Sequence, residues 1–381
     1  MKQISYDNKQ DQILSYFIVG YFFFQALNLL VKLVIGNFVL WSIISKGSLA
    51  LLLLLALKPM LQRNLKAFFI SESIFFILFS YTLFFRFAEY NDIKPLIMNV
   101  LTVFTPLGIA TASIKNVKFL LKCLYIVSFP IQAIMYLVIS TRTSFDYSMV
   151  SGYILIFQAM VLFDRFFLKF KWYDLLLCLV ILAETFIYCS RGPLLCFGVM
   201  AALSILTRTT IRRSKKIVAI LATGALLLAT YFFYNEMINC LIKLCSFLGY
   251  SSRNLYLLTH ERIAYDSGRF EIVSYYLDKI RSGSIVGHGL AGGWIDVDTY
   301  PHNIIIELML SFGSVLGVLS FGVIIFLVYH AISTFNEDKR RVVIILSALS
   351  TQLFVSGSFL TTPAFFMLIS LGVQSMSRRM R

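Results

Sequence analysis

Apolar runs of about 17 to 25 residues recur along most of the chain, and they restrict the possible folds more than any other feature of the sequence. Each run is long enough to cross roughly 30 Å of hydrocarbon as a helix. Because lipid offers no hydrogen-bond partners to backbone amides, such runs must form helices or the strands of a closed barrel. The runs are continuously apolar and lack the alternation of barrel strands. The sequence therefore predicts an all-α polytopic membrane protein.

We expect about twelve transmembrane helices. Their predicted ranges are 13–35, 38–57, 67–87, 93–112, 119–140, 148–168, 172–189, 193–207, 217–234, 302–329, 342–358 and 361–376. The chain is expected to form one membrane domain, with helices 1–9 in residues 1–234 and helices 10–12 in residues 302–381. Residues 235–301 between them are predicted to form one large external loop that contains short amphipathic helices. No cleavable signal peptide is expected, because the first apolar run is long enough to remain as a span.

The positions of the basic residues predict the orientation. If the N-terminus is cytoplasmic, 22 of the 34 lysines and arginines lie in inner segments, as positively charged loops prefer. Both termini are then cytoplasmic, and the 235–301 loop is external. The net charge of +15 is accounted for by this topology, so nucleic-acid binding is not expected. With 59% hydrophobic and 14% charged residues, the chain also has too little polar surface for a soluble fold of 381 residues.

Neither of two kinds of metal site is favoured. Asp296 and Asp298 have the Asp-x-Asp spacing by which many sugar-nucleotide transferases hold a divalent cation, but those enzymes need a soluble nucleotide-binding fold. The four histidines form no close pair and no cysteine pair has zinc-ligand spacing, so no metal and no other cofactor is expected. A disulfide between Cys240 and Cys245 is one possibility, and a helix that buries both as packing residues is the favoured one.

Arg191 is one of the basic residues that fall on the outer side. It lies in the Ser190-Arg191-Gly192 turn between the seventh and eighth predicted spans. An arginine that extends to the interface would explain it equally well. Glu184 lies two helical turns earlier on the same face, where it could orient or neutralise Arg191. A carboxylate inside a span is rare enough to suggest a functional site, so both residues are candidates.

Residues 266–319 contain most of the site-like polar residues, directly before a predicted span. Ser267 and Gly268 can cap a helix that begins near Arg269, and apolar residues then repeat at three- and four-residue steps. We expect this helix to lie along the membrane face with its apolar side down. Arg269 would stand at its N-terminus, where free amides and the helix dipole already favour an anion. Its guanidinium is therefore a candidate phosphate clamp.

His302 follows Pro301 and precedes Asn303 at the start of the tenth predicted span. A histidine at a membrane–water boundary can accept a proton near neutral pH, and the Asn303 side chain can hold a neighbouring group in place. A histidine that only marks the interface is the alternative. His288 lies between two glycines, and no role is assigned to it.

The order of these motifs resembles that of the O-antigen ligase/polymerase superfamily of bacterial inner-membrane glycosyltransferases. The shared pattern is an Arg in a Ser-Arg-Gly turn, a second Arg that opens a helix before a Gly-x-Gly turn, and a His-Asn pair that leads into an apolar helix with spaced glycines. It covers roughly residues 184–320, and the first 180 residues match only in hydropathy. The resemblance implies a fold of about twelve spans with one large periplasmic loop.

The resemblance also implies roles for individual residues. Arg191 and Arg269 correspond to the arginines that bind the donor pyrophosphate, and His302 corresponds to the candidate base for the acceptor hydroxyl. The implied substrates are oligosaccharides linked to undecaprenyl pyrophosphate, and a chain-length co-polymerase is a further implied partner. We favour a polymerase of surface-polysaccharide repeat units over a ligase that transfers glycan to lipid A–core. A polytopic transporter or flippase for the same lipid-linked sugars is the alternative from another class.

Overall fold

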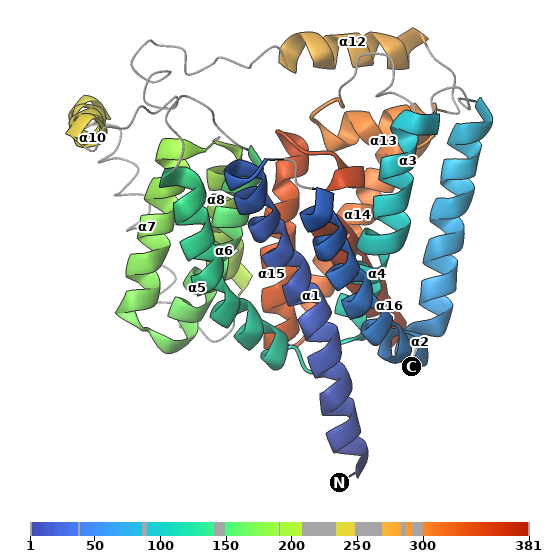
Figure 1. Cartoon of the computed structure of the whole chain (residues 1–381). Helices are drawn as coiled ribbons and strands as arrows, with labels where there is room; N and C mark the ends of the chain where they lie inside the picture. The colour runs from blue at the N-terminus through green and yellow to red at the C-terminus, as the bar shows by residue number, and fades with distance from the viewer. Residues whose placement is uncertain are drawn as a thin grey trace. The chain divides into compact units, whose positions relative to one another are not determined.

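The computed structural model describes residues 2–36, 39–85, 90–140, 149–189, 191–207, 234–247, 269–282, 287–291 and 300–379 (Figure 1). Within these ranges the chain forms helices and no strand, so the predicted all-α fold is confirmed. The helices are α1 (Lys2–Val34), α2 (Val39–Phe85), α3 (Tyr90–Asn99), η2 (Val100–Phe104), α4 (Thr105–Ser113), α5 (Lys118–Ser140), α6 (Met149–Lys169), α7 (Trp172–Tyr188), α8 (Gly192–Thr207), α10 (Tyr234–Phe247), α12 (Arg269–Ser282), α13 (Ile304–Phe312), α14 (Ser314–Thr334), α15 (Glu337–Ser350), η3 (Thr351–Phe354), η4 (Phe359–Thr361) and α16 (Pro363–Arg379).

Six helices in the described part of the chain are long and apolar enough to cross a membrane. They are Asp7–Lys32, Val39–Phe84, Asp92–Ser113, Lys118–Val138, Met149–Lys169 and Ser314–Thr334. Many of their large apolar side chains are exposed, above all along α2 and α14. Water is a poor environment for so continuous an apolar surface, and lipid is a suitable one. The fold is thus compatible with the membrane class, while the count of twelve spans stays a prediction.

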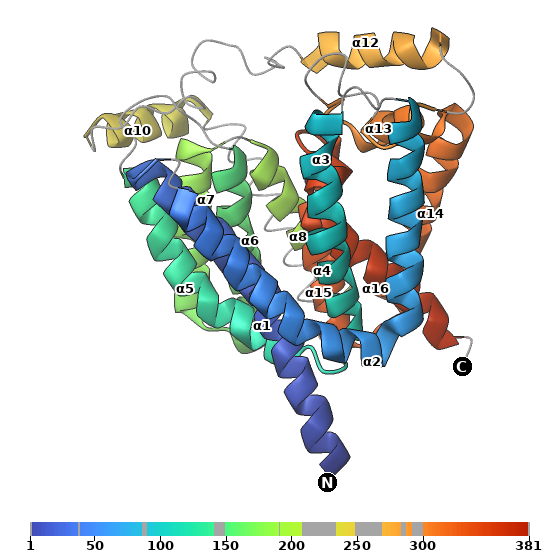
Figure 2. The ribbon, with the colours of Figure 1, turned by 45° about the vertical axis from the view of Figure 1, so that its right-hand side comes forward.

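Two of the predicted spans are the two arms of α2. This helix runs from Val39 to Phe85, but Asn64 within it has a non-helical backbone (φ −142°, ψ 41°). Both arms of α2 run upward from this kink in the view of Figure 2. The predicted boundary between spans 38–57 and 67–87 therefore falls at a real bend. The predicted ninth span, 217–234, lies almost wholly outside the described residues.

The predicted tenth span, 302–329, is wrong as a single helix. The chain breaks at Gly313 (φ 86°, ψ 161°), a backbone conformation that a residue with a Cβ rarely adopts. The preceding helix, α13, has nine residues and is about 14 Å long, too short to span a bilayer. The membrane-length helix is α14, which begins at Ser314. Gly317 allows the two helices to pack closely, since a Cβ there would collide with the backbone of Met309.

The predicted eleventh span, 342–358, is also interrupted, whereas the twelfth, 361–376, corresponds to the single helix α16. α15 ends at Ser350, although the prediction extended that helix to residue 358. Residues 351–362 instead form η3, a non-helical stretch and η4, and α16 begins at Pro363. Proline lacks the N–H that a continuous helix would need at this position, and the stretch before it contains Gly357 and several hydroxyl residues.

The chain divides into two compact units. Unit 1 consists of Met1–Phe24, Val39–Leu124 and Asp266–Arg381, and unit 2 consists of Gln25–Phe38 and Tyr125–Tyr265. Within unit 1, the start of α1 and the end of α16 lie at one end, and α12 and α13 lie at the other (Figures 1 and 2). The prediction had placed both termini on one side of the membrane and the loop that carries α12 on the other.

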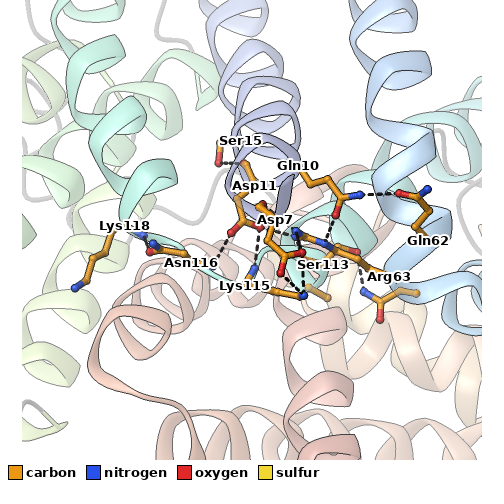
Figure 3. A network of polar contacts seen from close by, with 12 residues as sticks. Asp7, Gln10, Asp11, Ser15, Gln62, Arg63, Ser113, Lys115, Asn116 and Lys118 are labelled. Carbon is orange, nitrogen blue, oxygen red and sulfur yellow. Dashed lines mark hydrogen bonds and ion pairs between the residues drawn. The ribbon is translucent and has the colours of Figure 1, made fainter. Parts of the chain in front are cut away.

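A polar network, shown in Figure 3, joins three helices of unit 1 near the α2 kink. The Arg63 guanidinium donates to the Asp11 carboxylate at 2.5 Å, to the Ser113 carbonyl at 2.9 Å and to the Asp7 carbonyl at 3.0 Å. Next to it, the Asn64 amide donates to the Ser113 hydroxyl at 2.7 Å. These bonds hold α1, the bend of α2 and the end of α4 together, and they provide polar partners at the position where α2 leaves helical geometry.

Candidate functional site

Arg269 is the first residue of α12, as its sequence context predicted. Its guanidinium donates from Nη1 to the carbonyl oxygen of Val355 at 2.5 Å, and the side chain is half-buried. Val355 lies in the non-helical stretch between η3 and η4. The proposed cap residues Ser267 and Gly268 lie outside the described residues. The structure thus puts a guanidinium at a helix N-terminus and ties it to the broken segment between α15 and α16.

The apolar side of α12 packs against α13 of the same chain, and that α12 lies along the membrane face stays a prediction. Tyr276 is fully buried in a cluster with Ile306 and Leu310 of α13. The partly buried side chains of α12 that join this cluster are Ile272, Val273, Leu277 and Ile280. Phe270, the first apolar residue of α12, is not part of this cluster and is 75% exposed. This packing fixes α12, and therefore Arg269, on the helix that His302 precedes.

Two neighbours of His302 in the sequence, Tyr300 and Asn303, make contacts that fix the chain on either side of it. Asn303 is the N-cap of α13, where its side-chain oxygen accepts from the backbone N–H groups of Ile305 at 2.9 Å and Ile306 at 3.4 Å. The Tyr300 ring lies 4.4 Å from the imidazole, centroid to centroid, and its hydroxyl donates to the Ser356 carbonyl at 2.8 Å. His302 itself has φ 54°, the left-handed region that residues other than glycine seldom occupy. Neighbouring structure therefore holds a locally unfavourable conformation in place.

The environment of His302 keeps its imidazole neutral. Burial lowers the pKa of His302 below its ordinary value, and the positive charge of Arg269 lowers it further. Its Nδ1 atom is buried and has no hydrogen-bond partner in the part of the chain that the structure describes. A neutral imidazole next to a guanidinium can accept a proton while the guanidinium binds an anion. The structure therefore brings Arg269 and His302 together at one end of unit 1.

The Gly287-His288-Gly289 turn covers the C-terminal end of α13. The backbone N–H of His288 donates to the Leu310 carbonyl at 2.7 Å, and that of Gly289 donates to the Ser311 carbonyl at 3.0 Å. Both glycines have positive φ, 67° and 79°, and a Cβ at Gly287 would collide with the backbone of α13. The glycines are thus needed for close approach and for capping the helix carbonyls. The role of the His288 side chain stays unassigned.

Arg191 and Glu184 belong to unit 2. Arg191 directly precedes α8, and its carbonyl accepts from the Leu195 N–H at 3.3 Å. Glu184 of α7 accepts from the side-chain amide of Gln132 at 2.5 Å, a partner that sequence spacing had not indicated. That Glu184 orients Arg191, and that Arg191 acts together with Arg269 and His302, both stay predictions. Ser190, Asp296 and Asp298 lie outside the described residues.

Sequence reasoning missed a buried glutamate in this region. Glu307 of α13 is 2% exposed and accepts hydrogen bonds from the Ser358 hydroxyl and from the Phe359 N–H, the latter at 3.2 Å. It lies within an apolar run, Ile304-Ile305-Ile306-Glu307-Leu308, that was predicted to be a span. The rule that singled out Glu184, a carboxylate inside a predicted span, applies equally to Glu307 and could have found it.

Comparison of the chain with protein-family models, with curated proteins and with solved structures finds no match. The features that bear on function are therefore the sequence motifs and the geometry of unit 1.

Proposed function

We propose that the protein is a membrane glycosyltransferase that polymerises oligosaccharide repeat units carried on undecaprenyl pyrophosphate. The observation that carries this proposal is the pairing of a helix-N-terminal guanidinium, Arg269, with a half-buried neutral imidazole, His302. The first can bind a diphosphate and the second can accept a proton from a sugar hydroxyl. These are the two tasks that transfer from a diphosphate-linked sugar requires.

In the proposed reaction, an acceptor hydroxyl attacks the anomeric carbon of the donor sugar. The bond between that carbon and the pyrophosphate oxygen breaks, and its electron pair leaves with undecaprenyl pyrophosphate. His302 accepts the proton of the hydroxyl as the new glycosidic bond forms. Arg269 stabilises the negative charge that develops on the leaving pyrophosphate, and Arg191 is proposed for the same role from its Ser-Arg-Gly motif. Asn303 holds His302 at the start of α13, and Glu184 is proposed to orient Arg191.

The proposed setting is a bacterial inner membrane, with the site on the periplasmic side and both termini in the cytoplasm. Long apolar helices that expose their side chains suit a substrate with a long hydrocarbon tail, because donor and enzyme then share the same lipid phase. Membrane lipids and the lipid-linked oligosaccharides are the proposed partners, with a chain-length co-polymerase as a further one. No metal is required in this reaction, because guanidinium groups can take over the stabilisation of the leaving group.

Purified protein incubated with defined lipid-linked repeat units tests the proposal. We expect glycans of several repeat units to form without any other protein, as read from the lengths of the released glycans. If the protein is a transporter, lipid-linked units will cross the bilayer of reconstituted vesicles and no lengthening will occur.

A gene deletion separates polymerase from ligase. A polymerase deletion leaves one repeat unit on the surface lipid, and a ligase deletion leaves none. Surface lipid that carries no repeat unit in the deletion strain would therefore support the ligase.

A further inference from the structure

The segment Val355–Phe359, which follows η3 and ends with the first residue of η4, supports both halves of the candidate site. Its first two carbonyl groups accept from site side chains, Val355 from Arg269 and Ser356 from Tyr300. The Tyr300 ring in turn contacts the ring of His302. A displacement of this short segment would therefore move the guanidinium and the imidazole together or separate them.

Glu307 is the side chain that ties this segment to α13. One carboxylate oxygen accepts from the Ser358 hydroxyl and the other accepts from the Phe359 N–H. Glu307 is 2% exposed, and Ser358 and Phe359 are buried as well. A buried carboxylate is costly unless hydrogen bonds satisfy it, and here both oxygens are used on a single segment. The Ser358 hydroxyl also accepts from the Leu360 N–H at 3.0 Å, which fixes the start of η4.

The same helix, α13, positions His302 at its N-terminus through Asn303 and carries Glu307 one turn later. Glu307 also lies close to α12. After burial and the neighbouring Tyr275, its negative charge contributes to raising the pKa of Tyr276. The glutamate thus lies where α12, α13 and the Val355–Phe359 segment meet, and each of these elements carries or holds one part of the site.

We propose that Glu307 is a positioning residue: it fixes the Val355–Phe359 segment on α13 and so sets where the Arg269 guanidinium lies relative to the His302 imidazole. This inference rests on the proposed function for the reaction that Glu307 serves. The alternative is a carboxylate that stabilises the fold without affecting the geometry of the site, and the two can be separated experimentally.

The test compares Glu307→Ala, Glu307→Gln and Ser358→Ala with the matched control Ser375→Ala. Ser375 is a buried serine of α16 whose hydroxyl contacts His330 Nδ1 at 2.8 Å and donates to the Gly372 carbonyl at 2.6 Å, and neither partner belongs to the candidate site. We expect Glu307→Ala to lower kcat for glycan lengthening by about 30- to 100-fold, since small misplacements of catalytic groups have effects of that size. Glu307→Gln should recover activity to within about fivefold of wild type, because an amide can still bond to both Ser358 and Phe359. Ser375→Ala should retain wild-type kcat within about twofold.

A second measurement does not depend on activity. The rate at which diethyl pyrocarbonate modifies His302, followed by mass spectrometry, reports how well the imidazole is held and covered. We expect faster modification in Glu307→Ala and Ser358→Ala, and an unchanged rate in Ser375→Ala. Equal rates in wild type, Glu307→Ala and Ser358→Ala overturn the inference, whatever the activity.

If wild-type protein lengthens no glycan, the proposed function fails, and the modification rates still decide whether Glu307 holds His302 in place. Should Glu307→Ala not fold, Ser358→Ala carries the same test, because it removes one of the two contacts.

Discussion

Unit 1 holds an arginine in a polar cluster at each of its two ends, and the two arginines differ in how their donors are used. Arg63 donates to the Asp11 carboxylate, to the Gln10 side chain and to the carbonyls of Asp7 and Ser113 (Figure 3). Arg269 donates to a single neutral carbonyl, that of Val355, within the part of the chain that the structure describes. Its titratable neighbour His302 is an imidazole kept neutral by burial and by Arg269 itself.

The difference indicates that Arg63 stabilises the fold, and it supports the proposal that Arg269 binds an anionic ligand. The donors of Arg63 are committed to groups of the protein, and two carboxylates, Asp7 and Asp11, balance its charge. Among the described residues, Arg269 pairs with no carboxylate and uses one donor on the Val355 carbonyl, at a helix N-terminus that favours an anion. Variants of the two arginines and of the residues around them test this contrast.

Loss of either site residue should have the largest effect. We expect His302→Ala and Arg269→Ala each to lower the rate of glycan lengthening by about 100- to 1000-fold, the range for losing a general base or a leaving-group stabiliser. Arg281→Ala is the matched control on the same helix, because its side chain is 77% exposed and pairs only with Asp278 three residues earlier among the contacts described. The measurement is lengthening by folded, detergent-purified protein. Full activity of Arg269→Ala would remove the clamp, and full activity of His302→Ala would remove the base.

Loss of Arg63 should affect stability and not catalysis. Arg63→Ala leaves the buried Asp11 carboxylate without its cationic partner, so we expect the free energy of unfolding to fall by roughly 3 kcal/mol. Activity per folded molecule should stay within about threefold of wild type, because the described contacts of Arg63 are with α1 and α4 and not with α12 or α13. Chemical denaturation in detergent and the lengthening assay measure the two effects. Loss of activity in Arg63→Ala protein of normal stability would contradict the division between a stabilising and a binding arginine.

The pH dependence should show a base that is unprotonated at neutral pH. Because burial and Arg269 lower the pKa of His302 below its ordinary value of 6.5, protons bind to it only at more acidic pH. We expect kcat/KM to be nearly constant from about pH 7.5 to 6.5 and to fall about tenfold per pH unit below the lowered pKa. A pH–rate profile of the wild-type protein checks this. An acid limb with its midpoint above 6.5 would show that His302 is not in the environment described.

The smallest effect is expected for the helix cap next to His302. Asn303→Ala removes the cap of α13 and should lower the free energy of unfolding by about 1 kcal/mol. It should also lower activity several-fold, because His302 precedes the cap directly. Asn336→Ala is the matched control, since Asn336 caps α15 by accepting from the Lys339 N–H at 3.1 Å. The Asn336→Ala variant should lose a similar free energy of unfolding and keep wild-type activity. Equal activity in the two variants would show that the cap does not help to hold His302.

Much of the site could be located from local sequence patterns. The start of α12 at Arg269 was predicted from the cap candidates before it and the apolar periodicity after it, and Pro301 indicated the helix start next to His302. The all-helical fold followed from runs of apolar residues. That Arg191 and Glu184 act with Arg269 stays a prediction.

The contacts that make the site depend on residues far apart in the chain. Arg269 reaches Val355 across 86 positions, and Glu307 reaches Ser358 across 51. No local periodicity reports such pairs. The spans predicted from hydropathy also ran through the helix breaks at Gly313 and at residues 351–362. Apolar composition alone does not show where a helix breaks. Sequence by itself determined the helical class, the helix that begins at Arg269 and a helix start next to Pro301. Tertiary packing alone decided which broken segment would hold Arg269, because hydrogen bonds between distant residues form only after the helices have packed.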